Sequence, residues 1–277
     1  MRKIAIQGGL GAFHEIAAKH YFEGEEIEII PRNTFKELFH SLNQGHVDLG
    51  ITAIENSLAG SILPNYNLLK ESDMKIIGEI YLRIKQNLVA LKGQNISDIK
   101  EVYSHPMAIL QCQDYFDQYP NIKVIESIDT ALSAKEIHDK NLYGVGAIAS
   151  GLAAENYDLE ILADSIETNK MNYTRFLILG DDDEVKKITN PNKASISFAL
   201  AHKIGSLSKI LSILSYYDIN LSKVQSLPIV GKDWEYQFYV DLLFDNYKIY
   251  KQAFEAIRPF TSNLGILGEY NKGVSII

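Results

Sequence analysis

The residues best suited to chemistry gather in short polar clusters, and the most informative cluster surrounds Arg175. Thr174 directly precedes Arg175, and Asn172 lies three residues before it. A guanidinium can bind a carboxylate through two parallel hydrogen bonds, and a neighbouring hydroxyl can add a further contact. The sequence therefore predicts a carboxylate-binding site at Arg175, with pairing to an acidic side chain of the protein as the alternative.

A second cluster consists of Glu55-Asn56-Ser57, with Gly60 shortly after it, and follows an apolar segment. A carboxylate, an amide and a hydroxyl in a row can orient a polar ligand. Asn and Ser are also favoured as helix caps, and the residues alone leave these two interpretations open.

A third cluster begins with Ser104-His105-Pro106 and continues to Cys112. Either Ser104 or His105 can cap a helix that starts at Pro106, and His105 can titrate near neutral pH. Cys112 falls within that helix and is interpreted as a small core residue. A Cys–His nucleophile pair is therefore not expected.

The fourth cluster is a turn that contains Gly8, Gly9 and Gly11 after the first expected strand. Backbone N–H groups in such a turn can bind an anion at the start of a helix, but a plain tight turn has the same composition. The turn lacks the lysine and the spacing of a P-loop and does not match the dinucleotide fingerprint. It gives little support for nucleotide binding.

The elements that must position these clusters follow from apolar runs that alternate with amphipathic segments over residues 1–180. This alternation predicts mainly parallel sheets covered by helices, with ligands at the carboxyl ends of the strands. Strands are expected at 3–6, 27–30, 49–52, 76–82, 87–91, 102–104, 124–126, 146–149 and 174–179. Helices are expected at 15–22, after a Thr34 cap, from Pro106, and at 131–138. The strand at 174–179 is expected to return to the first lobe, because two lobes need crossing strands to form a hinged cleft.

The remaining residues predict a small domain with the ferredoxin-like order βαββαβ. Its strands are expected at 194–200, 221–229, 236–243 and 266–270, its helices at about 207–214 and at 247–257, and a turn at 231–233. The expected catalytic domain is 1–182, with one lobe at about 1–75 plus 168–182 and another at about 76–167. A polar linker at 183–192 and the small domain at 193–277 follow it.

Composition excludes several functional classes. The 277 residues carry a net charge of −8, from 35 acidic and 27 basic side chains, so a nucleic-acid partner is not expected. Cys112 is the single cysteine, which excludes an intrachain disulfide framework and suits a reducing cytoplasm. No metal site is expected, because the seven histidines lack paired helical spacing. Neither a signal peptide nor a membrane span is expected.

In their order along the chain, the clusters resemble the motifs of the prephenate dehydratase family. The matching segments are 8–15 (the glycine-rich opening), 54–57 with Gly60 (IENS…G), 104–112 (SHP.AL.QC), 129–131 (STA) and 172–176 (N.TRF). One such tripeptide is a weak signal, whereas five in family order, spread over nearly the whole chain, are a strong one.

The resemblance implies an α/β fold, in which a two-lobed catalytic domain of the type II periplasmic-binding-protein kind is followed by an ACT domain. It implies a lyase that converts prephenate to phenylpyruvate during phenylalanine biosynthesis, with loss of carbon dioxide and water and without a cofactor. It further implies L-phenylalanine as an effector and a cytoplasmic homo-oligomer, either a dimer or a tetramer. No nucleic-acid or membrane partner is expected.

The resemblance also assigns roles to individual residues. Thr174 is the expected proton donor, and Arg175 and Phe176 complete the catalytic motif. The expected substrate-binding residues are Gly11, Glu55, Asn56, Ser57, Ser104, Thr130 and Asn172. The expected effector-binding residues are Gly205, Ser206, Leu207 and Ser226.

The sequence departs from the family pattern in two places. Ala12 and His14 stand where many members have Thr and Ser. In the small domain, Gln225 and Leu227 replace the Glu and Arg of an ESRP motif, while Trp234, Tyr236, Phe238 and Asp241 keep the W.Y.F..D run. These departures bear on substrate contacts and on the response to phenylalanine.

Three alternatives remain open. The chain can be an arogenate dehydratase, because arogenate differs from prephenate only in an amino group that replaces the keto group. It can be a non-catalytic phenylalanine-binding protein, since the two-lobed fold also serves binding proteins. It can also regulate a partner enzyme through its ACT domain. The chain enters the glycine-rich strand directly, so a monofunctional enzyme without chorismate mutase activity is expected.

Overall fold

The computed structural model describes residues 1–201, 203–229, 231 and 235–276. They form two compact units, of which the first comprises Met1–Gly60, Ile80–Phe176 and Ser275–Ile277, and the second comprises Ser61–Glu79 and Leu177–Val274. The expected turn positions Lys232 and Asp233, and Trp234 after them, lie outside the described residues. The domain bounds expected from the sequence follow the order of the chain and stay a prediction.

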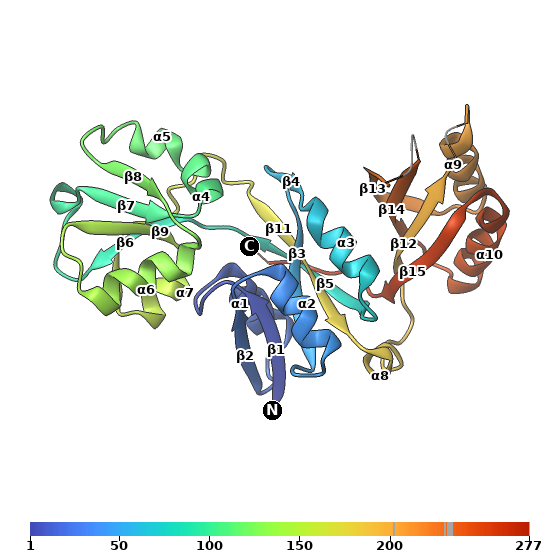
Figure 1. Ribbon diagram of the computed structural model, residues 1–277, viewed down its shortest axis with the longest axis horizontal. Coiled ribbons are helices and arrows are strands. Elements are labelled where there is room, and N and C mark those ends of the chain that lie inside the picture. The colour runs from blue at the N-terminus through green and yellow to red at the C-terminus, as the bar shows by residue number, and fades with distance from the viewer. Residues whose placement is uncertain (202, 230, 232–234, 277) are drawn as a thin grey trace. The chain divides into compact units, whose positions relative to one another are not determined.

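The first sheet has the strand order β16-β5-β11-β3-β1-β2, with β4 paired to β3 (Figure 1). The strand bounds are β1 Arg2–Gln7, β2 Ile27–Arg32, β3 Leu49–Asn56, β4 Gly60–Ser61, β5 Lys75–Arg83, β11 Tyr173–Gly180 and β16 Ser275–Ile276. β1 pairs in parallel with both β2 and β3. β11 lies between β5 and β3, which confirms the expected return of this late strand to the first lobe.

The helices of the first lobe are α1, Phe13–Tyr21, and α2, Phe35–Asn43. The Thr34 side chain accepts a hydrogen bond from the backbone N–H of Glu37 at 3.1 Å, which confirms the expected cap of α2. β3 is longer than expected. Glu55 and Asn56 are its last residues and not a turn after it, because the apolar pattern that marks the strand ends before the strand itself does.

The second sheet has the order β10-β6-β9-β7-β8. Its strands are β6 Asn87–Leu91, β7 Glu101–Ser104, β8 Lys123–Glu126, β9 Val145–Ala149 and β10 Leu159–Ala163. β7 pairs in parallel with β8 and β9, but β6 pairs antiparallel with both β9 and β10. The expectation of mainly parallel pairing is therefore wrong for this sheet, because β6 runs opposite to both of its neighbours, β9 and the unexpected β10.

Short helices connect these strands. They are η1 Ile96–Asp98, α4 Pro106–Gln111, α5 Gln113–Phe116, α6 Thr130–Lys140 and α7 Gly151–Asn156. Pro106 is the first residue of α4, and the Asp129 side chain caps α6 by accepting from the backbone N–H of Leu132 at 2.9 Å. Both helix starts confirm the sequence expectation.

The second unit contains the expected βαββαβ order in an antiparallel sheet, β13-β14-β12-β15. The elements are β12 Lys193–Leu200, α9 Ser206–Tyr216, β13 Asn220–Pro228, β14 Tyr236–Leu243, α10 Tyr247–Ile257, η2 Arg258–Phe260 and β15 Ser262–Tyr270. α9 and α10 lie together beside this sheet (Figure 1). Their apolar side chains, such as Leu214 and Phe254, share one core with Phe198 of β12.

Two further helices belong to this unit, and the sequence did not indicate either. α3, Leu63–Glu71, contacts the small sheet, since the ring of Tyr66 lies 4.9 Å from that of Tyr239 and Lys70 Nζ donates to Gln237 Oε1 at 2.7 Å. α8, Asp182–Val185, is a single turn within the expected linker and is capped by Asp181.

A buried ion pair fixes β12 to β5. Lys193 Nζ lies 2.9 Å from both carboxylate oxygens of Glu79, and the two side chains are 1% and 0% exposed. The backbone N–H of Gly273 donates to the same carboxylate at 3.1 Å. A Cβ at Gly273 would stand 2.2 Å from the Glu79 carbonyl oxygen, so only glycine fits there.

We predict that Lys193→Met lowers the free energy of unfolding by about 3–5 kcal/mol, because it leaves the Glu79 carboxylate buried without its cation. The double variant Lys193→Met with Glu79→Gln should regain part of this loss. Urea unfolding followed by circular dichroism measures both. A single variant as stable as the parent protein would contradict the predicted weight of the pair.

Candidate active site

Asn56, the last residue of β3, is the centre of the polar network. Its Nδ2 donates to Asn172 Oδ1 at 2.7 Å and to Thr174 Oγ1 at 2.9 Å. Its Oδ1 accepts from the backbone N–H groups of Leu58 and Ala59, both at 2.9 Å. Two donated and two accepted bonds use the full capacity of an amide side chain. Asn56 therefore positions its neighbours.

Thr174 receives one of these bonds on β11 and is 8% exposed. Because its oxygen accepts from Asn56, its own O–H proton remains to be donated elsewhere. A hydroxyl whose oxygen accepts a hydrogen bond is polarised, and its proton is the more readily donated. This arrangement suits a proton donor.

The network continues into the second lobe through Asn172, which is fully buried. Asn172 Nδ2 donates to Gln111 Oε1 at 2.9 Å, and Gln86 Nε2 approaches the same oxygen at 3.4 Å. The sequence motif 104–112 contains Gln111, but the residue was not among the expected site residues. Its inclusion in a motif that matches the family was the available signal.

Ser57, which directly follows β3, is hydrogen-bonded to residues at or just before the start of β11 through both its backbone and its side chain. Its backbone N–H donates to the Tyr173 carbonyl oxygen at 2.8 Å, its Oγ donates to the Met171 carbonyl oxygen at 3.0 Å, and Tyr173 N–H donates back to Oγ at 2.9 Å. Ser57 is exposed, but its hydroxyl already serves this crossing. Together, Asn56 and Ser57 hold the residues before Thr174 in a fixed position.

Arg175 is buried, with 4% exposure, and its neighbours include an acid and an aromatic ring. Its Nη1 lies 3.9 Å from Glu55 Oε2, and its Cζ lies 5.9 Å from the ring centre of Tyr81. A close charge-assisted hydrogen bond measures about 2.7–2.9 Å, so the approach of Glu55 is a loose ion pair. The acidic neighbour that the sequence analysis gave as the alternative for Arg175 is therefore present, and the binding of a substrate carboxylate by Arg175 stays a prediction.

Phe176 belongs to the core. It is 1% exposed, and its ring meets that of His14 edge-on at 4.9 Å. His14 is also buried, and its Nε2 accepts from the backbone N–H of Ala53 at 3.2 Å. Burial lowers the pKa of His14 to about 3. The departure at His14 therefore replaces a small polar residue with a neutral packing residue, and burial favours packing for Phe176 in place of the expected catalytic role.

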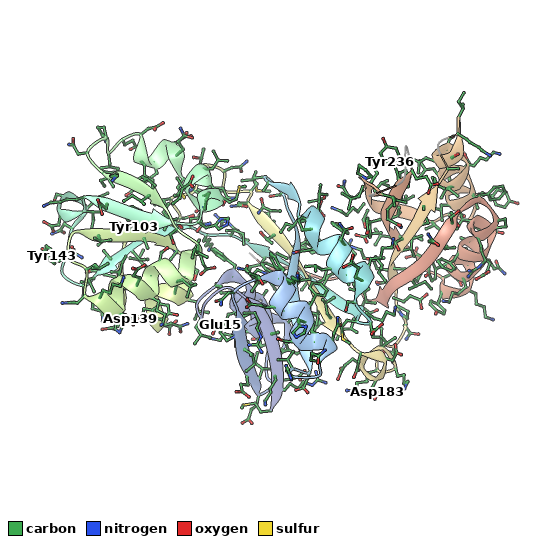
Figure 2. All side chains as sticks on the ribbon, viewed as in Figure 1. Glu15, Tyr103, Asp139, Tyr143, Asp183 and Tyr236 are labelled. Carbon is green, nitrogen blue, oxygen red and sulfur yellow. The ribbon has the colours of Figure 1, made fainter. Side chains whose placement is uncertain are left out.

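The glycine turn serves the contact between the two lobes. Gly11 has φ +88°, and a Cβ there would stand 2.5 Å from the Cα of Ala153 in α7. Its N–H donates to Glu15 Oε2 at 2.6 Å, and its carbonyl oxygen accepts from Ser150 Oγ at 2.6 Å. Glu15 lies on α1 (Figure 2). The N–H group expected to face an anion is thus held by a carboxylate of the protein, and substrate binding by Gly11 stays a prediction.

The remaining expected site residues come from the second lobe. Ser104 is fully buried, and its Oγ donates to the Ile148 carbonyl oxygen at 2.7 Å. Thr130 is the first residue of α6 and is partly exposed. His105 Nδ1 accepts from the N–H of Met107, so His105 and not Ser104 caps α4. Cys112 is buried, which raises its pKa to about 12 and confirms its interpretation as a core residue.

The expected effector residues lie on two elements of the small domain. Gly205, with φ +79°, precedes α9, and Ser206 and Leu207 open that helix. Ser226 is an exposed residue of β13, opposite Phe238 of β14. β13 is the first strand in the order of this sheet, so one of its sides is an edge.

A cavity of about 410 Å³ lies elsewhere in the first unit, and it contains none of the expected site residues. Its walls come from α1, the end of β5, α7, β10 and β16; they include Phe13, Lys19, Arg83, Glu155, Asp164 and Ile276. Both basic and acidic side chains line it. No helix among the described residues is long and apolar enough to cross a membrane.

We predict that His14 makes the protein less stable in mild acid. The folded protein keeps His14 neutral down to a pKa of about 3, whereas the unfolded chain takes up the proton below its ordinary value of 6.5. The free energy of unfolding therefore falls by about 1.4 kcal/mol per pH unit as the pH drops below about 6.5, because only the unfolded chain binds this proton. His14→Gln can still accept from Ala53 and does not titrate.

Urea unfolding at pH 7.5 and at pH 5.5 checks this expectation. The parent protein should lose about 1.4 kcal/mol more between these two conditions than His14→Gln does. Equal losses in the two proteins would contradict a depressed pKa at His14.

Comparisons with known proteins show which family this chain belongs to. Residues 4–184 match the family model described as prephenate dehydratase. A relative from Arabidopsis thaliana, named arogenate dehydratase/prephenate dehydratase 2, chloroplastic, is 34% identical over 281 residues, which cover 97% of this chain and 72% of the relative.

Solved structures match along the whole chain. One, described as GqqA, a novel type of quorum quenching acylases, has a TM-score of 0.87 at 27% identity and covers 98% of each chain. Another, prephenate dehydratase in complex with L-Phe from Arthrobacter aurescens, has a TM-score of 0.86 at 25% identity and covers 97% of this chain and 90% of its own. With the family model matched over most of the two-lobed part and the hydrogen-bonded Asn56–Asn172–Thr174 cluster in place, this chain belongs to the prephenate dehydratase family.

Proposed function

We propose that this chain converts prephenate to phenylpyruvate with loss of carbon dioxide and water, as a carbon–oxygen lyase of phenylalanine biosynthesis. The single observation that carries the proposal is the hydrogen bond from Asn56 to Thr174, next to the buried cation of Arg175 on the same strand. A polarised hydroxyl and a guanidinium are the two groups that this reaction needs.

The chemistry sets these requirements. The bond between the ring and its carboxylate breaks, and that electron pair becomes part of the aromatic ring. The bond between the ring and its hydroxyl breaks in turn, and the hydroxyl takes one proton to leave as water. Aromatisation supplies much of the driving force. The enzyme must therefore hold a dianion still and place one proton against the leaving oxygen.

Thr174 is the proposed proton donor. A threonine hydroxyl is a weak acid in water, so its position must supply most of its effect. Asn56 fixes the Thr174 oxygen at 2.9 Å, and Asn172 and Ser57 fix the chain just before it. The proton can then point only away from Asn56, toward a bound substrate.

Arg175 is the proposed contact for a substrate carboxylate. The protein as a whole is acidic, with a net charge of −8, so a dianion needs a local cation. Glu55 lies 3.9 Å from the guanidinium and is partly exposed, so it can turn toward solvent when a substrate carboxylate arrives. Glu55 itself is proposed to orient Arg175, because its charge repels the substrate.

The choice between prephenate and arogenate is the open part of the proposal. The Arabidopsis relative has both substrates in its name, whereas the Arthrobacter structure is named as a prephenate dehydratase. We propose prephenate as the preferred substrate. Incubation with each compound, while phenylpyruvate and phenylalanine are followed separately, decides between them. If only arogenate is turned over, arogenate replaces prephenate as the proposed substrate, and the proposed mechanism is unchanged.

We predict that Thr174→Val lowers kcat by about 100-fold or more and changes KM by less than about threefold, because a general acid contributes mainly in the transition state. Valine keeps the β-branched shape on β11 and removes only the hydroxyl. Thr174→Ser, which keeps the hydroxyl, should retain most of the activity.

Steady-state kinetics of phenylpyruvate formation measure these variants. An unchanged kcat in Thr174→Val would remove Thr174 from the mechanism. If the parent protein turns over neither prephenate nor arogenate but still binds phenylalanine, the proposed enzyme activity is wrong and a regulatory binding protein is the better interpretation.

We also propose that the βαββαβ domain is an ACT domain that responds to L-phenylalanine, which the Arthrobacter structure carries by its description. A physical link to the site supports this. Lys223 of β13 donates from Nζ to Ser61 Oγ at 2.9 Å and lies 5.6 Å from the ring centre of Tyr66. Ser61 follows Gly60, at the end of the cluster that holds Asn56. A movement of β13 on effector binding would therefore pull on this segment.

We predict that Lys223→Met uncouples the two domains. Activity without phenylalanine should stay within about twofold of the parent, phenylalanine should still bind, and its effect on activity should fall to a small fraction. Lys248→Met, the same charge change on α10, is the matched control and should keep the response.

Calorimetric binding of phenylalanine and initial rates with and without it check the prediction. A full response in Lys223→Met would exclude this residue from the link. No binding to either variant or parent would remove phenylalanine as the effector.

A cytoplasmic homo-oligomer, either a dimer or a tetramer, completes the proposal. β13 leaves one side at the edge of the small sheet, and its exposed Val224 adds an apolar side chain there. Such edges pair readily with a second strand. The free thiol of Cys112 suits a reducing compartment.

A further inference from the structure

Two residues of β16 lie along β5 close to the candidate active site. β16 pairs in parallel with β5, so that Ser275 is opposite Tyr81 and Ile276 is opposite Leu82. β16 is the outermost strand of the sheet, and β5 lies between it and β11. The segment near Tyr81 is thus held on both sides, by β11 on one and by β16 on the other.

Tyr81 connects this pairing to Arg175. The Tyr81 ring centre is 5.9 Å from the Cζ of Arg175, within the range of a cation–π contact. Arg175 is a residue of β11, the strand beside β5. A ring that contacts a guanidinium in this way constrains it without using any N–H donor. Glu55, in contrast, approaches an N–H side of the guanidinium, with 3.9 Å between its Oε2 and Arg175 Nη1, and a substrate carboxylate would also bind through N–H groups.

We propose that Tyr81, held in place by β16, is a positioning residue that keeps the Arg175 guanidinium in place to receive a substrate carboxylate. This inference rests on the proposed function of Arg175. When the substrate displaces Glu55, the ring contact remains, and the guanidinium does not have to be ordered again. This arrangement should increase substrate affinity, because a side chain that is already ordered loses less conformational entropy when the ligand binds.

β16 has its own part in this arrangement. The residue two positions before it, Gly273, is bonded to Glu79 of β5, so the segment follows β5 over several residues. Removal of β16 would expose the backbone of β5 at Tyr81 to water and free its side chain. Ile276 also forms part of the wall of the cavity described above, beside Leu82 and Arg83.

The test compares Tyr81→Leu, Tyr81→Phe and a chain that lacks residues 275–277, with prephenate as the substrate. In Tyr81→Leu, KM should rise by about 3- to 20-fold while kcat stays within about twofold, since the lost contact acts on ground state and transition state alike. Tyr81→Phe keeps the ring and should stay within about twofold of the parent in both constants.

The shortened chain should raise KM in the same direction. When the shortened chain also carries Tyr81→Leu, its KM should be less than about twofold above that of Tyr81→Leu alone, because both changes act through the same ring. Thermal unfolding of each protein identifies any general loss of stability, which would lower kcat and the active fraction without a selective change in KM. If Tyr81→Leu does not fold, Tyr81→Met replaces it.

Arg175→Lys separates the inference from the proposed function. A raised KM in Arg175→Lys, with an unchanged KM in Tyr81→Leu, would overturn the positioning role of Tyr81 alone. An unchanged KM in Arg175→Lys would overturn the substrate contact of Arg175, and the positioning role with it. A raised KM in Tyr81→Leu with an unchanged KM in the shortened chain would overturn the part assigned to β16.

Discussion

The site depends on one constraint, the saturation of the Asn56 amide. With both donors and both acceptor positions engaged, this side chain has one orientation, and it fixes the Asn172 amide and the Thr174 hydroxyl together. Buried networks of this kind are worth most when every member is satisfied and become costly when one bond is missing. Through Asn172 the network reaches Gln111 of the second lobe, and Arg175 directly follows the bonded Thr174 on β11.

The division into two units follows spatial packing and crosses the order of the chain. β5 and β11 each pass from one unit to the other, and α3, which follows the Asn56 cluster, packs with the small sheet. The buried Lys193–Glu79 pair is costly to desolvate, and its excellent geometry, with a third donor from Gly273, is what makes such a pair tolerable.

Much of the fold could be predicted because local signals agree with it. Thr34, Pro106 and Asp129 begin helices as expected, and the bounds of α10 match the periodic pattern of 247–257. Other elements could not be predicted, because they depend on tertiary contacts. No helix was expected at 63–71, and the residues against which α3 packs, Tyr239 and Gln237, lie far along the chain. The sequence identified the motif residues by their types. It could not predict which of them join the hydrogen-bonded network, which belong to the core and which form the turn. Only packing shows that Phe176 is buried and that Glu15 occupies the N–H of Gly11.

The strand order of the first sheet has a consequence for biosynthesis. β3 and β5 are made early, but β11, which lies between them, is made about a hundred residues later, and β16 later still. Chains emerge from the ribosome at about 5–20 residues per second, so the open edges of β3 and β5 wait for several seconds without partners. Unpaired edges invite association between nascent chains. The exposure of these two edges therefore ends only when β11 has been made and takes its place between β5 and β3.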